Sequence, residues 1–383
     1  MSLFINTKYY VLFMDMNELK KLNKKLKEIN NWISICYKKI LIRGILKSTE
    51  KPKITALITL YNSQDYVHIA LTSVQNQLFK DIEILLIDDG STDNSLNLIQ
   101  RFQEEDKRIK IIKNKKNRGA LYSKSIGILK SGGQYVMLLD SDDLFANENI
   151  FNISYYEAIQ NKIDIVEFSG YNLNYEYFQL NNVPEIPYYL RFKQHNELIQ
   201  QPDLSYFIYR KLEEFKYRLI DGFLWGKCIK SNIFKMSLKI VGSYIYRQKI
   251  NYGDDRIINF ILFKLANSFK YINEYGIIYK LNNNSITHFN SFINNCKDEL
   301  INIMSLYNYT KNTKESDIVA FEIIFRWNHI IFPGLNINNY QCMKKLINKL
   351  LLNKYIRNEY KEKLLSFSKN LTISKNSQIF LLS

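Results

Sequence analysis

From residue 54 onward, short apolar runs alternate with segments in which apolar residues recur every three or four positions. The runs are rich in Ile, Leu and Val and predict strands at residues 54–60, 82–88, 109–113, 134–140 and 163–168. The segments between them predict helices at residues 65–78, 93–106, 119–131 and 147–161. Strands separated by helices form βαβ units, whose crossovers build a parallel sheet covered on both faces. We therefore expect an α/β protein.

Three of the predicted strands are followed by polar residues. In chain order these are Tyr61-Asn62, Asp88-Asp89-Gly90 and Asp140-Ser141-Asp142. Ligands of such sheets bind at the carboxyl ends of the strands. The pattern predicts an acidic ligand site at this edge of the sheet.

The densest acidic cluster, Asp140, Asp142 and Asp143, follows the apolar run YVMLL. Neighbouring carboxylates repel each other, and burial makes ionisation costlier, so the cluster needs solvent or a cation nearby. One interpretation is a solvated turn that opens a helix, with Asp143 or Asn147 near the helix start. The other is a metal site, which the second acidic strand end favours. Mg²⁺ or Mn²⁺ would take oxygen ligands and leave places for the phosphates of a nucleoside diphosphate.

Several other classes of protein lack their motifs here. There is no GxxxxGK[ST] loop, and the first turn, LYNSQDY, lacks the GxGxxG of a dinucleotide binder. The four cysteines have no zinc-ligand spacing and no disulfide pattern. No apolar stretch reaches the roughly 18 residues that span a bilayer, and the N-terminus lacks a secretory pattern. We expect a cytoplasmic protein without a transmembrane helix.

The 383 residues are 46% hydrophobic, which suffices for a sizeable core, and they carry a net charge of +16. Residues 1–53 hold twelve Lys or Arg against four Asp or Glu, a net charge of +8. This segment has helical periodicity. It is either a solvated helix packed on the main domain or a peripheral contact with the cytosolic face of a membrane. No RRM, KH or helix-turn-helix signature occurs, so no nucleic-acid partner is expected.

Four segments together resemble the inverting glycosyltransferases of family two. They are ITALITLYN, SVQNQLFKDIEILLIDDGSTDNS, NRGALYSKSIGILKSGGQYVMLLDSDD and IIYKLNNNSIT, and they follow the family's order over about residues 53–290. The resemblance implies a GT-A fold, a Rossmann-like mixed sheet flanked by helices. It also implies a division into a basic helical extension (1–50), the catalytic domain (51–290) and a helical C-terminal region (291–383).

The resemblance implies roles for the donor-side residues. Leu60, Tyr61 and Asn62 would line the nucleoside pocket. Asp89, with Asp88 beside it, would accept a hydrogen bond from the base, with a UDP-sugar as the favoured donor. Gly119 and Gly127 stand where the family keeps small residues around the donor. Lys124 stands where arginine is usual and would meet a donor phosphate as a point charge.

The family's DxD motif corresponds to Asp140, Ser141 and Asp142. Asp142 would contact Mn²⁺ or Mg²⁺ directly, and Asp140 would face the ribose or bind the metal through water. Asp143 would cap the following helix. A metal at this place would stabilise the departing nucleoside diphosphate.

The family places its general base in an acidic pair before a helix, which NYGDDRIINF resembles. Asp255 is the predicted base, and Asp254 would orient it or contact the acceptor. Family members more often have Glu-Asp here, and a helix N-cap is the alternative. Trp225 would stack on the acceptor sugar or belong to the core. His288 would reach the metal or diphosphate, or be structural.

The leading functional hypothesis is a metal-assisted, inverting, hexosyltransferase-like transfer of a sugar from a nucleoside diphosphate sugar to an acceptor hydroxyl. The acceptor can be a glycan, a lipid or a protein. A catalytically inactive sugar-nucleotide-binding protein is the first alternative. A nucleotidyltransferase is the second, although no Gly-rich triphosphate loop is present.

Overall fold

The structure is a computed structural model of the chain. It describes residues 51–174, 187–188, 198–200, 209–212, 216–219, 223–242, 249–250, 253, 255–281, 292–313, 315–326 and 337–380. The predicted N-terminal helix, Asp254 and His288 lie outside the described residues.

The central sheet is mixed and has ten strands, eight of which follow the order β3-β2-β1-β4-β11-β6-β12-β5. Their bounds are Ile54–Leu60 (β1), Ile82–Asp88 (β2), Ile109–Lys113 (β3), Tyr135–Asp140 (β4), Leu144–Phe145 (β5), Ile165–Asn174 (β6), Lys227–Lys230 (β11) and Ser268–Leu281 (β12). Strands β1 to β4 are parallel, whereas β11 runs antiparallel to both of its neighbours and β5 antiparallel to β12. Pro187–Tyr188 (β7) and Leu198–Gln200 (β8) pair with β6 and β12, and Tyr209–Leu212 (β9) pairs with Lys216–Leu219 (β10).

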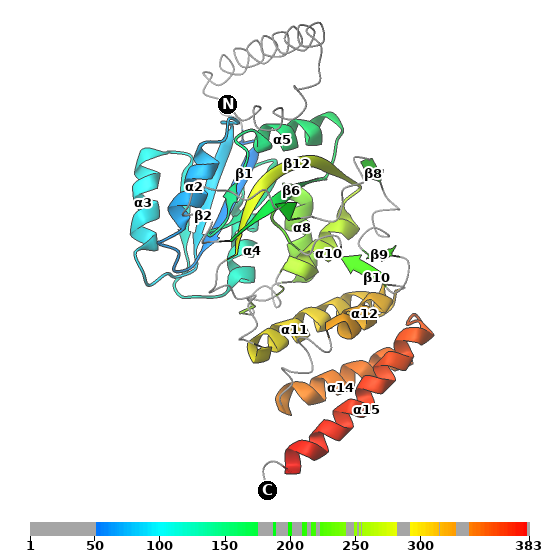
Figure 1. Ribbon diagram of the computed structural model, residues 1–383. Helices are drawn as coiled ribbons and strands as arrows, with labels where there is room; N and C mark the ends of the chain where they lie inside the picture. The colour runs from blue at the N-terminus through cyan, green and yellow to red at the C-terminus, as the bar shows by residue number, and fades with distance from the viewer. Residues whose placement is uncertain are drawn as a thin grey trace, which may run out of the picture. The chain divides into compact units, whose positions relative to one another are not determined.

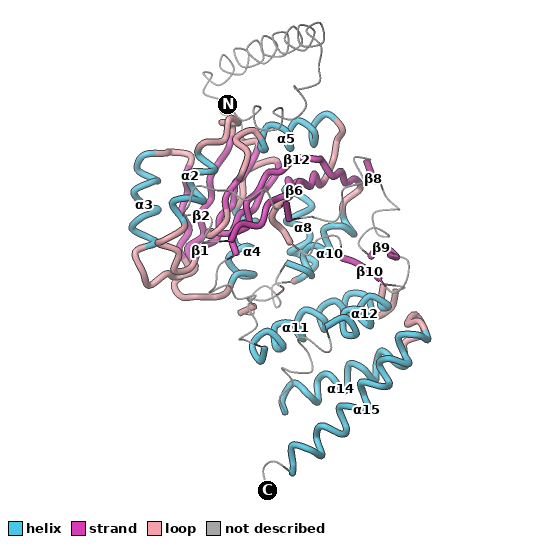
Figure 2. The backbone as a smooth tube through the Cα atoms, viewed as in Figure 1, coloured by secondary structure: helices cyan, strands magenta, loops and turns pink. Residues whose placement is uncertain are grey.

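The four predicted helices form inside their predicted ranges. They are Val67–Gln75 (α2), Ser95–Glu105 (α3), Ala120–Lys130 (α4) and Ile150–Gln160 (α5). Later helices are Ser231–Val241 (α8), Asp255–Leu265 (α10), Phe292–Thr310 (α11), Ser316–Arg326 (α12), Ile337–Leu352 (α14) and Asn358–Phe380 (α15). Figures 1 and 2 show helices on both faces of the sheet.

Side chains of β1 alternate between two hydrophobic cores, because successive residues of a strand point to opposite faces. Ala56 and Ile58 belong to a core shared with α2, α3 and α5. Leu57 belongs to a second core, shared with α4, α8 and α10. This second core continues into α11, α12, α14 and α15, so it crosses the predicted boundary at residue 290. The division into domains stays a prediction.

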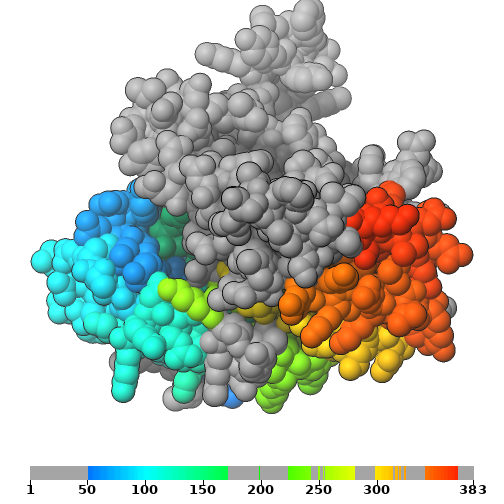
Figure 3. Space-filling view, turned by 90° about the horizontal axis from the view of Figure 1, so that it is seen from below, coloured from blue at the N-terminus to red at the C-terminus, as the bar shows by residue number. Residues whose placement is uncertain are grey.

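Helix α14 is amphipathic. On α14, Leu346 and Leu350 are buried, whereas Lys345 and Lys349 are exposed. Figure 3 shows the surface of the C-terminal helices in orange and red. Among the described residues, no helix has the length and apolar content needed to cross a membrane.

Strand register brings the acidic strand ends together. Leu60, the last residue of β1, pairs with Asp88 on β2, and Thr59 pairs with Asp140 on β4. The chain fills the sheet on one side of β1 with β2 and β3 and then crosses to the other side with β4. Such a change of direction is where open α/β sheets bind ligands.

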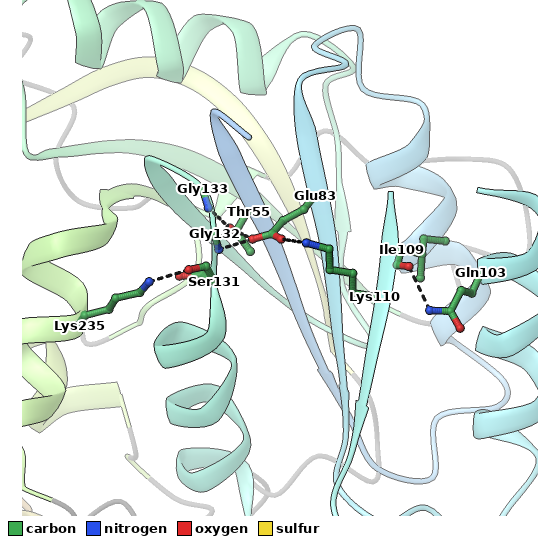
Figure 4. Close-up of polar contacts among 9 residues, drawn as sticks. All are labelled: Thr55, Glu83, Gln103, Ile109, Lys110, Ser131, Gly132, Gly133 and Lys235. Carbon is green, nitrogen blue, oxygen red and sulfur yellow. Dashed lines mark hydrogen bonds and ion pairs between the residues drawn. The ribbon is translucent and has the colours of Figure 1, made fainter. Parts of the chain in front are cut away.

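A buried carboxylate ties the opposite end of these strands together (Figure 4). Glu83, near the start of β2, accepts hydrogen bonds from Thr55 Oγ1 (2.6 Å), Lys110 Nζ (2.8 Å) and the Gly132 N–H. Gly133 N–H donates to Thr55 Oγ1 at 2.9 Å. A Cβ on Gly133 would lie 2.5 Å from Thr55 N, so the turn between α4 and β4 needs glycine there. Burial raises the pKa of Glu83, but the three hydrogen bonds outweigh it and hold the pKa below its ordinary value.

We predict that Glu83→Gln lowers the free energy of unfolding by about 1–3 kcal/mol at pH 7, because an amide cannot accept all three bonds. The wild-type advantage is full above the unfolded-state pKa of about 4.3 and is lost as pH falls through the lower folded-state pKa. Urea unfolding of both proteins at pH 7 and pH 3 measures this. Glu105→Gln, at an exposed position of α3, is the control. An equal gap at both pH values would contradict the prediction.

Candidate active site

The turn after β1 is bound to the turn after β2. Asn62 N–H donates to Ser91 Oγ (3.0 Å), and Thr92 N–H donates to Asn62 Oδ1 (2.8 Å). Leu60 is buried, whereas Tyr61 is exposed. Hydrogen bonds therefore link the two turns that are predicted to lie at the nucleoside pocket.

The two aspartates at the end of β2 have different surroundings. Asp88 is fully buried; its Oδ1 accepts the Ser91 N–H, and its Oδ2 has no hydrogen-bond partner among the described residues. Asp89 accepts bonds from Asn114 Nδ2 (2.8 Å) and from the backbone N–H groups of Arg118 (3.0 Å) and Gly119 (2.8 Å). These bonds hold the start of α4, where Gly119 has a φ of 93°. Contact between Asp89 and a base stays a prediction.

The acidic end of β4 contains carboxylates that repel one another. Burial and the charge of Asp140 raise the pKa of Asp142 to about 6. Burial, followed by the charges of Asp142 and Asp140, raises the pKa of Asp143 well above its ordinary value. Ser141 lies beside the β1 turn, with its Oγ 2.8 Å from Ser63 Oγ.

The predicted helix cap at Asp143 is wrong. Helix α5 begins at Ile150, with Asn149 at its N-cap position. Asp143 is instead followed by the short strand β5, which pairs with β12, and its Oδ1 accepts the Lys280 N–H of β12 at 2.9 Å. Asp143 therefore ties β12 to the acidic strand end.

Two buried lysines lie among these carboxylates. Lys124 Nζ, on α4, is 3.6 Å from Asp140 Oδ1 and 2.9 Å from Asp255 Oδ1. Lys280 is also buried. Desolvation lowers its pKa below the ordinary value, although the charges of Asp142 and Asp143 act in the opposite direction. Sequence reasoning missed Lys280, although a lone cation inside the apolar run IIYKL was the available signal.

The carboxylates at the end of β4 fit a hard divalent ion that is bound partly by protein and partly by the phosphates of the substrate. Among the described residues, no group of three or more His, Cys, Asp or Glu side chains converges as a metal site. Asp140 and Asp142 supply carboxylate oxygens whose mutual repulsion a cation would relieve. Mg²⁺ is commonly bound by one or two carboxylates together with substrate phosphates.

Asp255 is the first residue of α10 and is 7% exposed. Lys124 Nζ donates to its Oδ1, and the Leu224 N–H donates to its Oδ2 at 3.1 Å. Lys124 thus joins Asp140, at the end of β4, to the predicted base. A position in the first turn of a helix also suits an acidic residue for purely electrostatic reasons.

Trp225 lies in the core, with 6% of its surface exposed. Its ring stacks with Phe223 (centroids 4.8 Å apart) and Tyr279 (5.7 Å apart). Stacking of Trp225 on an acceptor sugar stays a prediction. Gly127, predicted near the donor, instead packs α4 against Leu57 of β1.

Comparison with known proteins identifies the sequence family. The family model described as Glycosyl transferase family 2 matches residues 55–214. This region is a family 2 glycosyltransferase domain. The match starts within β1 and contains both acidic strand ends.

Relatives extend the likeness beyond the family 2 domain. Glycosyltransferase GlyA of Streptococcus pneumoniae is 27% identical over 237 residues, 61% of this chain and 31% of that protein. The cholesterol galactosyltransferase of Borreliella burgdorferi is 24% identical over 323 residues, 82% of each chain. The chain spans 31–40% of the length of the first curated relatives that it matches.

A solved structure shares the fold. Residues 1–349 of S. aureus TarS, crystallised with UDP-GlcNAc, superpose with a TM-score of 0.58 at 13% identity, over 85% of this chain and 92% of that one. The predicted GT-A fold of the family 2 domain is confirmed.

Proposed function

We propose that the protein transfers a sugar from a nucleoside diphosphate sugar to an acceptor hydroxyl group. The observation that carries this proposal is the convergence of Asp140, Lys124 and Asp255, the first two of which lie in the region that matches family 2. A UDP-sugar is the proposed donor, because TarS, which shares the fold, was crystallised with UDP and with UDP-GlcNAc.

The donor would lie across the end of β1. The joined turns at Asn62 and Ser91, with Asp88 and Asp89 behind them, would hold the nucleoside. The cationic side chain of Lys124 would face the diphosphate. A dianionic ligand next to this buried lysine would be favourable, since charges interact strongly where water is excluded.

Asp142 and Asp140 are the residues that would hold Mn²⁺ or Mg²⁺. When bound, the ion supplies positive charge that stabilises the departing diphosphate. The raised pKa of Asp142 agrees with a carboxylate placed to receive a cation.

Asp255 would act as the general base. Its carboxylate takes the proton of the acceptor hydroxyl while that oxygen forms a bond to the anomeric carbon, and the bond from this carbon to the diphosphate oxygen breaks. Lys124 and the Leu224 N–H each occupy one site on a different oxygen of Asp255, which orients the carboxylate and leaves lone pairs for the proton. A single displacement of this kind inverts the configuration.

One relative suggests which class of acceptor to test first. The Borreliella relative that matches most of this chain is named for galactosyl transfer to cholesterol, which makes a membrane lipid the first acceptor to test. The cytoplasmic location and the membrane contact of residues 1–50 stay predictions.

A donor screen tests the proposed function. The protein is incubated with Mn²⁺ and UDP-glucose, UDP-galactose, UDP-GlcNAc or GDP-mannose, with cholesterol in detergent, simple sugars or no acceptor. We expect nucleoside diphosphate release that rises when an acceptor is added. Tight UDP binding without release would instead support the inactive binder, and pyrophosphate release from a nucleoside triphosphate would support a nucleotidyltransferase.

The nucleoside pocket has its own prediction. Asp89→Asn replaces an acceptor of three N–H groups by an amide, so the start of α4 should loosen. We expect discrimination among UDP, CDP and GDP to fall by about 10-fold, the effect of losing one charged hydrogen bond. Calorimetric titration of the three ligands measures it. Unchanged selectivity would remove Asp89 from the pocket.

A further inference from the structure

The peptide bond between Phe223 and Leu224 has both of its polar groups bound by side chains. Its N–H donates to Asp255 Oδ2 at 3.1 Å. Its C=O accepts from Lys227 Nζ at 2.7 Å and from Asn259 Nδ2 at 2.8 Å. This peptide plane cannot rotate without breaking at least one of these hydrogen bonds.

The side chains that bind this peptide come from a helix and from a central strand of the sheet. Asp255 and Asn259 lie one turn apart on α10, and Lys227 begins β11 in the middle of the sheet. Asn259 and Lys227 are both buried. The orientation of the Leu224 N–H is therefore set by the helix that carries Asp255 and by the sheet.

Lys227 is an unusual residue for its position. It is 2% exposed and pairs across the strands with Glu167 of β6, which is 1% exposed, with 3.4 Å between Nζ and Oε2. An apolar pair of similar volume is often as stable as a buried ion pair. Packing alone therefore does not require the two charges. The hydrogen bond of Lys227 to the Phe223 carbonyl is the contact that an apolar residue could not make.

We propose that Lys227 is a positioning residue for Asp255. The inference rests on the proposed function, in which Asp255 takes the acceptor proton. Lys227 holds the Phe223–Leu224 peptide so that its N–H fixes one oxygen of Asp255, while Lys124 fixes the other. Glu167 balances the charge of Lys227 where water is excluded. The proposed donor contacts at Asp88, the last residue of β2, and at Asp89 do not involve this peptide.

The test is a variant that removes both charges, Lys227→Met with Glu167→Leu. A neutral core should keep the protein folded, with a melting temperature no lower than the wild type. A purely structural role would leave the transfer rate unchanged in such a folded variant. We expect kcat to fall by about 10- to 100-fold, the scale of a misplaced catalytic group, with the Kd for UDP within about twofold of the wild type.

A second ion pair, between Lys230 of β11 and Asp164 directly before β6, provides the control. Lys230 Nζ, on β11, lies 2.8 Å from Asp164 Oδ1, and among the described residues neither side chain contacts the Phe223–Leu224 peptide. Lys230→Met with Asp164→Asn removes the same two charges. This control should transfer sugar at the wild-type rate.

Each outcome decides the matter. Normal kcat in the folded Lys227→Met, Glu167→Leu variant overturns the inference while the proposed function stands. If that variant does not fold, Lys227→Leu with Glu167→Met removes the same contact with a different apolar pair, and normal kcat in this second variant likewise overturns the inference. A wild-type protein that releases no nucleoside diphosphate from any donor of the panel overturns the proposed function, and the inference with it.

Discussion

Replacing Asp255 by Asn should lower the rate of sugar transfer by about 10²- to 10⁴-fold, the usual contribution of a positioned general base. Asparagine keeps the size of the side chain and its bond to the Leu224 N–H but cannot take the acceptor proton. The affinity for UDP should change by less than about twofold, because the loss falls on kcat. Product formation under saturating donor, measured beside calorimetric titration of UDP, separates the two quantities.

A matched control addresses the alternative that Asp255 only stabilises the start of α10. Asp317 is also an acidic residue in the first turn of a helix, α12, and also has a cationic partner, with Arg357 Nε 2.5 Å from its Oδ2. Asp317→Asn should transfer sugar normally. A fully active Asp255→Asn would move the base to Asp254 or elsewhere.

Replacing Asp142 by Asn should remove the part of the UDP affinity that depends on Mn²⁺, a loss of at least about 10-fold. The fold should survive. Burial and the neighbouring Asp140 raise the pKa of Asp142, so its negative charge is unfavourable in the protein without a cation. The melting temperature of Asp142→Asn without metal should therefore equal or exceed that of the wild type.

Calorimetric titration of UDP with and without Mn²⁺ tests this second prediction, with thermal unfolding as the check on folding. Glu105→Asp, on the exposed end of α3, is a control that leaves the acidic strand end unchanged. If Asp142→Asn bound UDP with the same Mn²⁺ dependence as the wild type, Asp142 would not be a metal ligand.

Much of the nucleotide-binding half could be predicted from local patterns. Strands β1, β2 and β3 have the predicted bounds, because each is a short run rich in Ile or Leu. The placement of Asp88 and Asp140 at one edge of the sheet could be predicted because the carboxyl ends of parallel strands share an edge. These features depend on residues that are close together in the sequence, or on properties that all folds of this class share.

The polar contacts that complete the site depend on tertiary structure. Lys124 and Asp255 are 131 positions apart, and their bond arises only because α4 and α10 cover the same face. Strand β11 is four residues long and enters the sheet antiparallel, which periodicity cannot predict. The pairing of Lys227 with Glu167 depends on that strand. Asp143 was misplaced for the same reason, because its partner lies on β12.

The most direct test of the account is to follow the anomeric protons by NMR while the wild-type protein acts on an α-linked UDP-sugar with the acceptor found in the screen. We expect UDP and a β-linked glycoside to appear together, and Asp255→Asn to suppress both. An α-linked product, or a donor that binds and stays intact with every acceptor, would contradict it.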